Sequence, residues 1–235
     1  MSDLLASRSS ERPKALLAWS SGKDSAWTLH KLRTQDEVVV VGLLTTINRE
    51  AARVAMHAVR EQLLEAQAAA VGLPLVKVFI PSPCPNEQYE QAMGEAIARA
   101  RANGITQIAF GDLFLEDVRR YRENQLAGTG IQPIFPLWGL DTANLARTMV
   151  AAGLRAYLTC VDPKQLTPSF AGRTFDAQFL DELPPDVDPC GERGEFHTFA
   201  YAGPMFTAPI PIVPGVVVSR DGFVFADLLL QEAIR

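Results

Sequence analysis

Four consecutive valines at residues 38–41 constrain the fold of this chain more than any other feature. The apolar run continues to Thr45, whereas a strand with one face in water would alternate apolar and polar residues. A strand buried on both faces is typical of a parallel sheet with helices on each side. The run therefore predicts a buried strand over residues 38–45 in an α/β protein.

Three further apolar runs have the length and composition of strands, over residues 14–19, 75–80 and 106–110. Helical patterns over residues 51–70 and 86–102 lie between them. Strands that alternate with helices are typical of parallel sheets with crossover helices. We therefore predict a doubly wound parallel sheet of the Rossmann-like kind.

The second half of the chain has a different texture, because its prolines cluster and its helical segments shorten. The expected helices cover residues 142–151 and 175–180. Asp221-Gly222 lies between two β-rich runs, 216–219 and 223–226, and is typical of a hairpin turn. These features predict a second, smaller mixed α/β portion. We expect the domains to cover residues 1–125 and 126–235.

The composition, 48% hydrophobic and 21% charged over 235 residues, indicates a globular chain. A chain of this length buries roughly 70% of its unfolded surface, so its core needs no disulfide or structural metal. Three scattered cysteines favour a reducing compartment. With no long apolar run and no signal-like start, we expect a cytoplasmic protein without membrane contact. The net charge of −5 does not favour a nucleic acid partner.

The six residues Ser20 to Ser25 (SSGKDS) directly follow the first predicted strand and precede an amphipathic run. Small residues let the backbone curl, so that N–H groups and hydroxyls face one point at a helix N-terminus. Such a point favours an anion, and the charge of Lys23 makes phosphate the predicted ligand. The alternative is that Ser21 and Asp24 only cap the helix.

This loop is not a Walker A loop, because Asp24 follows Lys23 and no glycine lies five residues before Gly22. A carboxylate beside a bound phosphate is repelled unless a divalent cation lies between them. Asp24 is therefore a candidate Mg²⁺ ligand.

Polar or glycine-containing segments follow the other predicted strands, and ligands of doubly wound sheets bind at the carboxyl ends of the strands. Thr45 ends the second strand, and Gly111 and Asp112 follow the fourth. Gly111 would permit close backbone approach, and Asp112 would serve the metal or an incoming amine. A simple helix cap is the alternative for Asp112.

Two charged segments extend the candidate site. Arg119, Arg122 and Glu123 share one face at helical spacing, which suits either phosphate and carboxylate recognition or a solvated salt-bridged helix. A glycine-containing loop, Cys190 to Phe199, is dense in polar residues, and such loops often carry function. Its candidates for substrate contact are Glu192, Glu195 and His197.

The loop at residues 20–25 resembles the SGGKDS loop of the N-type ATP pyrophosphatases, the PP-loop superfamily, with Ser21 at the usual second glycine. Within that superfamily the chain resembles the diphthine-ammonia ligase family, through landmarks that extend in the expected order over nearly the whole chain. They are Trp19 to Ser25, Glu61 to Gln67 (EQLLEAQ), Gly111-Asp112, Pro136-Leu137-Trp138 and Cys190 to Phe199 (CGERGEFHTF).

The resemblance implies an adenine nucleotide alpha-hydrolase-like fold and an adenylating amide ligase that uses ATP and Mg²⁺. In that family ATP is split between its α and β phosphates, a substrate carboxylate becomes an acyl-adenylate, and ammonia displaces AMP. The first domain would bind ATP and the second would recognise the substrate. That substrate would be a carboxylate on a modified histidine of translation elongation factor 2.

The resemblance also implies roles for individual residues. The catalytic candidates are Lys23, Asp24 and Asp112, with Asp24 as the metal ligand. The ATP-binding candidates are Ser20, Ser21, Gly22, Lys23, Asp24, Ser25, Thr45 and Gly111. The substrate-binding candidates are Arg119, Arg122, Glu123, Glu192, Glu195 and His197.

Three other functions compete with this one. Bacterial relatives have been linked to amidation in cobalamin salvage, PP-loop enzymes also modify tRNA, and a sensor would bind ATP without turnover. The acidic net charge and the lack of paired cysteines weigh against tRNA thiolation, and Lys23 beside Asp24 favours chemistry over sensing. A homodimer is one expected state. His57, Cys190 and the proline-rich residues 207–215 receive no functional role.

Overall fold

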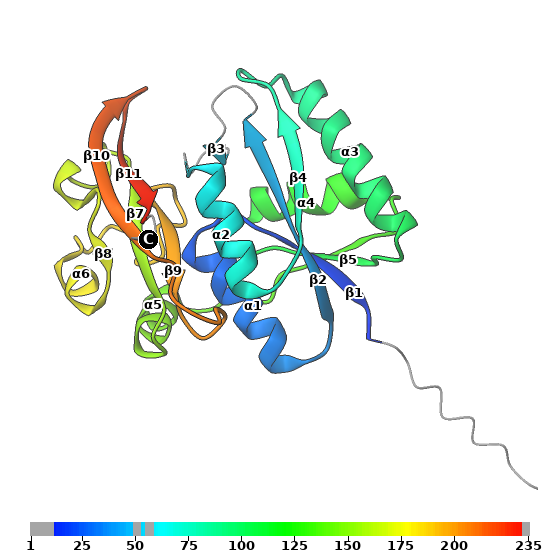
Figure 1. Ribbon diagram of the computed structural model, residues 1–235, viewed down its shortest axis with the longest axis horizontal. Coiled ribbons are helices and arrows are strands. Elements are labelled where there is room, and N and C mark those ends of the chain that lie inside the picture. The colour runs from blue at the N-terminus through cyan, green and yellow to red at the C-terminus, as the bar shows by residue number, and fades with distance from the viewer. Residues whose placement is uncertain (1–11, 49–52, 55–58, 232–235) are drawn as a thin grey trace, which may run out of the picture.

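The computed structural model describes residues 12–48, 53–54 and 59–231, and two sheets organise them (Figure 1). Five strands of the first sheet are parallel, in the order β4-β2-β1-β5-β6. They are β1 (Lys14–Ala18), β2 (Val39–Asn48), β4 (Leu75–Ile80), β5 (Gln107–Ala109) and β6 (Gln132–Ile134). The short β3 (Arg53–Val54) pairs antiparallel with the end of β2.

Helices cover both faces of this sheet, so the predicted doubly wound α/β core is confirmed. The helices are α1 (Lys23–Gln35), α2 (Glu61–Val71), α3 (Asn86–Ala102) and α4 (Glu116–Leu126). Leu17 and Leu43 point into the core that contains α1 and α2. Their sequence neighbours Leu16 and Leu44 point into the core that contains α3 and α4. Both alternate side-chain positions are apolar because both faces of the sheet are covered.

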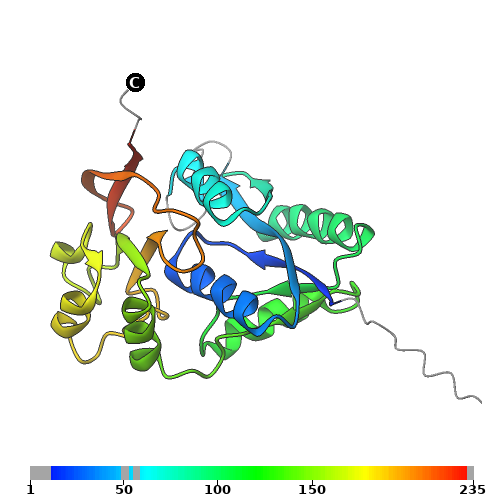
Figure 2. The ribbon, with the colours of Figure 1, turned by 60° about the horizontal axis from the view of Figure 1, so that its bottom comes forward.

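The second sheet is antiparallel and lies beside the first (Figure 2). Its strands are β7 (Arg155–Val161), β8 (Thr174–Phe175), β9 (Phe196–Ala202), β10 (Ile212–Arg220) and β11 (Phe223–Leu230). With them belong α5 (Thr142–Ala151), α6 (Ala177–Glu182) and the 3₁₀ turn Pro168–Phe170. The hairpin predicted at Asp221-Gly222 joins β10 to β11. A smaller mixed α/β portion follows the parallel core, as predicted.

The helix predicted over residues 51–70 is wrong in its first part. Arg53–Val54 forms β3 against the end of β2, and Arg60 is extended, so α2 begins at Glu61. His57 lies outside the described residues. The helix predicted from residue 175 also begins later, because Phe175 pairs with β7 and the Asp176 side chain caps α6.

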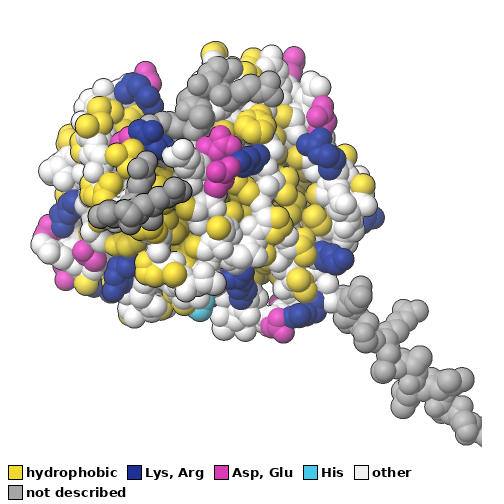
Figure 3. Space-filling model, in the orientation of Figure 1, with side chains coloured by type: hydrophobic (Ala, Val, Ile, Leu, Met, Phe, Trp, Pro, Cys, Tyr) yellow, Lys and Arg dark blue, Asp and Glu magenta, His cyan; other side chains and the backbone are white. Residues whose placement is uncertain are grey.

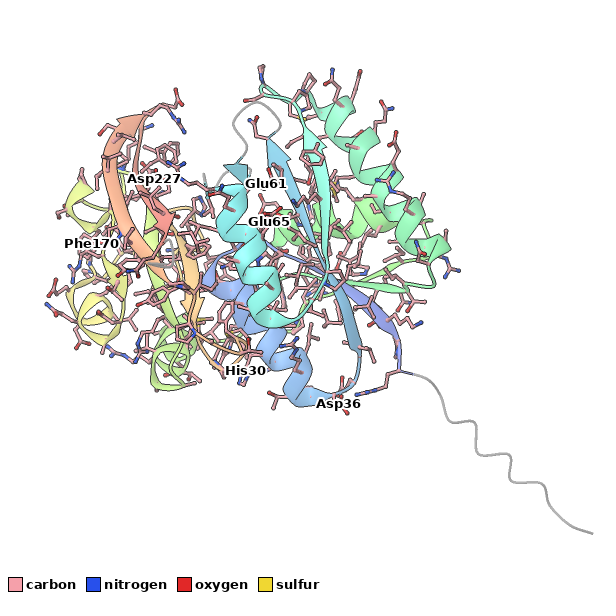
Figure 4. The ribbon with its side chains drawn as sticks, in the orientation of Figure 1. His30, Asp36, Glu61, Glu65, Phe170 and Asp227 are labelled. Atoms are coloured by element: carbon pink, nitrogen blue, oxygen red, sulfur yellow. The ribbon has the colours of Figure 1, made fainter. Side chains whose placement is uncertain are left out.

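The two parts of the chain are joined by polar contacts along α2. Arg60 pairs with Asp227 of β11 at 2.5 Å, and Figure 4 shows Asp227 beside the start of α2. At the other end of α2, the Ala70 carbonyl accepts the Thr207 N–H at 2.8 Å. Through this bond the proline-rich residues 207–215 are attached at Thr207 to the end of α2.

Figure 3 shows acidic and basic side chains together on the face that carries α2 and β4. There Lys77 lies 2.8 Å from Glu61 and 2.5 Å from Glu65. Such partly exposed pairs contribute little to stability.

Strand β6 belongs to the first sheet although it follows residue 125, and the division into two domains stays a prediction. Within the described ranges, no helix is long and apolar enough to cross a membrane.

Candidate active site

A cavity of about 540 Å³ opens at the carboxyl ends of β1, β2 and β5. The chain turns to opposite sides of β1 to reach β2 and β5, and this switch point is where doubly wound folds bind ligands. Residues of the first sheet and of the second part line it together. They are Ala18, Trp19, Ser20, Gly22, Lys23, Asp24, Ser25, Leu44, Thr45, Thr46, Ile80, Tyr89, Met93, Phe110, Gly111, Asp112, Arg122, Cys190, Gly191, Glu192, Phe196, His197 and Thr198.

The SSGKDS loop makes the tight turn that the sequence predicts between β1 and α1. Ser21 has a positive φ of 71°, and Gly22 is extended and forms the N-cap of α1. No side-chain hydrogen bond caps the helix, so Ser21 does not act as a cap. Asp24 does lie in the first turn of α1, where a carboxylate interacts favourably with the helix dipole as the alternative requires. The Ser25 hydroxyl donates to the Gly22 carbonyl at 2.9 Å. The Ser20 hydroxyl donates to the Ser25 hydroxyl at 3.2 Å.

Strand β9 supports this loop from the second part of the chain. The Lys23 N–H donates to the Thr198 hydroxyl at 3.1 Å, and the Ala200 N–H donates to the Ser21 carbonyl at 3.0 Å. One of the N–H groups at the start of α1 is therefore used by the protein itself. The conformation of the SSGKDS loop therefore depends on contacts with strand β9 of the second sheet, although the loop itself belongs to the first part of the chain.

The Lys23 ammonium is buried, with only 2% of the side chain exposed. It donates to Asp24 Oδ2 at 2.8 Å and to the Cys190 carbonyl, and it lies 5.4 Å from the Phe196 ring centroid. Burial is the largest single effect and lowers the pKa of Lys23, but the surrounding groups, with Asp24 first among them, together raise that pKa. Lys23 therefore remains a cation at the floor of the cavity.

Asp24 and Asp112 each keep a buried carboxylate oxygen with no hydrogen-bond partner among the described residues, Oδ1 of Asp24 and Oδ2 of Asp112. Burial raises the pKa of Asp24, against the opposing charge of Lys23. Burial likewise raises the pKa of Asp112, against Arg122, whose Nε lies 3.7 Å from Oδ2. Buried oxygens without partners are costly, and they point to a ligand that would satisfy them.

Gly111 is required by the protein's own packing. A Cβ atom there would lie 3.1 Å from the Asp24 carbonyl carbon and 3.2 Å from the Ser25 nitrogen. The loop after β5 therefore packs directly on the first turn of α1, and this contact brings Asp112 beside Asp24. Thr45 lies on the cavity wall, as predicted, but it does not end the strand, because β2 continues to Asn48.

The loop from Cys190 to Phe199 divides its charged residues between two environments. Glu192 lines the cavity and accepts the Leu113 N–H at 2.8 Å, and burial, opposed by this bond, raises its pKa to about 7. Glu195 is only 1% exposed and accepts the N–H groups of Asp188 and Arg193, both at 2.9 Å. Glu195 therefore organises its own loop.

His197 lines the cavity, and burial lowers its pKa to about 4 with help from the Lys23 charge. The imidazole is therefore neutral at physiological pH. Burial raises the pKa of the Cys190 thiol, so a thiolate nucleophile is disfavoured there. Cys190 contributes its backbone carbonyl to the site instead, and this carbonyl accepts a hydrogen bond from the Lys23 ammonium.

Most of the predicted site residues line one cavity, but four do not: Ser21, Arg119, Glu123 and Glu195. Arg119 pairs with Glu123 at 2.8 Å and lies 4.8 Å from the Trp138 ring centroid. These contacts match the salt-bridged helix that was the alternative for this face. Arg122 differs, because it turns toward Asp112 and the cavity.

The sequence patterns missed the apolar wall of the cavity, which Ile80, Tyr89, Met93 and Phe110 form. Ile80, Tyr89 and Met93 lie in β4 and α3 and Phe110 directly follows β5, so nothing in the local sequence separates them from other apolar or aromatic residues. Thr198 was missed as well. Its position within the CGERGEFHTF landmark was the available indication.

The described residues contain no group of three or more His, Cys, Asp or Glu side chains arranged to hold a metal ion. A Mg²⁺ ion bound with a nucleotide needs only one or two carboxylates, because phosphate oxygens and water complete its shell. The unpartnered oxygens of Asp24 and Asp112 fit that requirement.

Comparison with protein families matches two consecutive models, the diphthamide synthase N-terminal domain over residues 13–133 and the diphthamide synthase C-terminal domain over residues 141–221. Among curated proteins, the diphthine–ammonia ligase of Danio rerio is 31% identical over 70% of this chain and 71% of its own length. The human protein of that name is 32% identical over 48% of this chain. That of Schizosaccharomyces pombe is 26% identical over 94%. These matches span 45% of the human and 40% of the S. pombe protein.

Proposed function

The chain belongs to the diphthamide synthase family, and from this premise we propose that it is an ATP-dependent ligase that converts a carboxylate to an amide with ammonia. The observation that carries the proposal is the loop at residues 20–25, which leads into the N-terminus of helix α1 and lines a cavity. Carboxylate oxygens without a hydrogen-bond partner among the described residues belong to the same cavity. A helix N-terminus with a nearby cation favours phosphate. The apolar wall of the same cavity suits the adenine base.

Mg²⁺ is the second component of the proposal. Asp24 and Asp112 would hold it, because Oδ1 of Asp24 and Oδ2 of Asp112 have no hydrogen-bond partner among the described residues. Arg122, 3.7 Å from Asp112 Oδ2, forms only a long ion pair with that oxygen. The ion would neutralise charge on the phosphates and on the departing pyrophosphate. Lys23 stays protonated beneath the loop and adds a fixed positive charge to the same region.

The proposed chemistry has two steps. A substrate carboxylate oxygen attacks the α-phosphorus of ATP, the bond between the α-phosphorus and the bridging oxygen breaks, and pyrophosphate leaves. The nitrogen of ammonia then attacks the acyl carbon, and AMP leaves with the electron pair of the broken C–O bond. Glu192 is placed to accept the proton that ammonium must lose, because burial brings its pKa to about 7.

The similar curated proteins are diphthine–ammonia ligases, so we propose diphthine on elongation factor 2 as the carboxylate substrate. Glu192 on the cavity wall would also attract the trimethylammonium group that diphthine carries. The second part of the chain would recognise this substrate, and the first would bind ATP. With such a substrate, the proposed site of the reaction is the cytoplasm.

Product analysis tests the proposal. The protein is incubated with ATP, Mg²⁺, ammonium and diphthine-bearing elongation factor 2, and products are separated by chromatography and mass spectrometry. We expect AMP, pyrophosphate and amidated protein in equal amounts. Formation of ADP and phosphate would contradict ligation through an adenylate, and tight ATP binding without turnover would identify a sensor.

A further inference from the structure

Gln67 of α2 is a completely buried polar side chain that uses its hydrogen-bonding groups on three different segments. Its Oε1 accepts the Trp19 indole N–H at 2.9 Å. Its Nε2 donates to the Ser21 carbonyl at 2.9 Å and to the Ala200 carbonyl at 2.6 Å. The amide therefore joins the end of β1, the SSGKDS loop and strand β9.

This network involves a backbone unit in an uncommon conformation. Ser21 has a positive φ of 71°, which disfavours residues other than glycine, so the surrounding contacts must hold it there. The Ser21 carbonyl accepts two hydrogen bonds, from Gln67 and from the Ala200 N–H. The orientation of the Gln67 amide is fixed by its partners, since two are acceptors and one is a donor.

The direction of the Ser21 carbonyl determines the direction of the next N–H group. In a trans peptide the C=O and the following N–H point in opposite directions. Holding the Ser21 carbonyl toward Gln67 therefore aims the Gly22 N–H away from α2. Gly22 lines the cavity, and its N–H makes only a long bond, 3.3 Å, to the Ser20 hydroxyl.

We propose that Gln67 is a positioning residue that holds the loop at residues 20–25 in its ATP-binding conformation; this inference rests on the proposed function. Gln67 does not line the cavity, so it acts through the Ser21 peptide and not by touching nucleotide. Glutamine suits the position because it provides one acceptor and two donors. A carboxylate would face two carbonyl oxygens. An apolar side chain would remove one hydrogen bond from each of three buried groups, and the Ser21 carbonyl would keep only the bond from the Ala200 N–H.

The test measures ATP affinity in the presence of Mg²⁺ by calorimetry, below the unfolding temperature of every variant. Gln67→Met keeps the length of the side chain and removes its polar groups. Arg33→Met is the matched control, because Arg33 also joins α1 to α2 and to the second part, through the Val71 and Met205 carbonyls. Arg33 lies ten residues after Lys23, about 15 Å along α1 from the loop.

We expect Gln67→Met to weaken ATP binding about tenfold and Arg33→Met to change it less than about twofold. Should Gln67→Met fail to fold, Gln67→Asn keeps the amide but shortens the side chain by one methylene, so that it cannot reach all three partners, and a weakening of about threefold is expected. Wild-type ATP affinity in folded Gln67→Met, or in folded Gln67→Asn, would overturn the inference. An equal loss of ATP affinity in Arg33→Met would also overturn the inference, because it would show that any weakened contact between α1, α2 and the second part of the chain lowers ATP affinity. Failure of the wild-type protein to bind ATP would instead defeat the proposed function.

Discussion

The SSGKDS loop and the loop from Cys190 to Phe199 both place charged groups in the protein interior, but they satisfy them differently. Glu195 of the second loop has both carboxylate oxygens occupied by backbone N–H groups. Asp24 of the first keeps a buried oxygen without a partner among the described residues. A buried charge alone therefore does not mark an active site. An oxygen left unsatisfied in a cavity is the stronger indication.

Replacement of Asp24 should have the largest effect on activity. Asp24→Asn removes the proposed Mg²⁺ ligand and the anionic partner of Lys23 at 2.8 Å. We expect the rate of pyrophosphate release to fall by a factor on the order of 100 or more. Lys23→Ala should have a similar effect. Pyrophosphate release measured by a coupled assay checks both variants.

Folding must be measured alongside, because removing one member of a buried pair costs about 3 kcal/mol. Circular dichroism and thermal unfolding identify variants that remain folded at the assay temperature. Wild-type rates in folded Asp24→Asn and Lys23→Ala would remove the loop from the chemistry and erase the distinction between the two loops.

Replacement of Glu195 should affect stability and leave nucleotide affinity unchanged. In Glu195→Gln the amide NH₂ would face a backbone N–H that now donates to the carboxylate, so we expect unfolding to become easier by about 2 kcal/mol. Urea denaturation and an ATP titration measure the two quantities.

Glu182→Gln is the control for Glu195→Gln, because Glu182 is an exposed acid of the same part of the chain. Its stability should stay close to that of wild type, because substitutions of exposed side chains rarely change it. A Glu195→Gln variant with normal stability but weakened use of the acid substrate would instead support the direct substrate contact predicted from the sequence.

The stability of the protein should depend on pH through Glu192, because burial raises the pKa of this carboxyl to about 7 from an ordinary value of 4.5. Between these two values the folded state binds more protons than the unfolded state, so this group makes stability fall as pH rises. His197 acts in the opposite direction, since burial lowers its pKa to about 4 from 6.5. The two contributions oppose each other in wild-type protein.

Glu192→Gln should separate these contributions. The variant should gain stability relative to wild type as pH rises from 4.5 to 7, by at most about 1.4 kcal/mol per pH unit. The rise in amidation rate with pH near 7 should also disappear. Parallel stability curves for both proteins would show that the Glu192 carboxyl titrates normally, and an unchanged rate profile would remove it as the base.

The smallest effect is expected at Ser21, which has a positive φ of 71° and a buried hydroxyl without a partner among the described residues. Ser21→Gly relieves the backbone strain, partly offset by the greater freedom of glycine in the unfolded chain, so we expect a gain of about 0.5 kcal/mol. Asp221→Gly, with φ of 53° in the distant hairpin, is the control. Urea denaturation checks both, and a clear loss in Ser21→Gly would reveal a stabilising role for its hydroxyl.

Local sequence pattern predicted the parallel core and the part of the site that the core presents. The four valines indicated strand β2, which is buried on both faces at Leu43 and Leu44, although the valines themselves are only half-buried. Residues 86–102 predicted α3 with its observed bounds. Ser20 to Ser25 could be placed at the cavity because strand, glycine turn and helix are adjacent in the chain. Asp112 followed from the rule for strand ends.

What the sequence missed depends on contacts between distant segments. Glu195 is satisfied by its own loop, a geometry that composition does not reveal. Gln67 lies 46 residues from Ser21 and 133 from Ala200, and only the fold brings them together. The start of α2 was misplaced because helical periodicity continued through residues that pair as β3.

A crystal structure with Mg²⁺ and an ATP analogue whose α–β linkage resists cleavage would locate the nucleotide in the protein. The proposal predicts phosphate oxygens at the backbone of residues 20–25, the metal ion between them and Asp24, and the base against Phe110. An analogue bound elsewhere while this cavity remained open would contradict it.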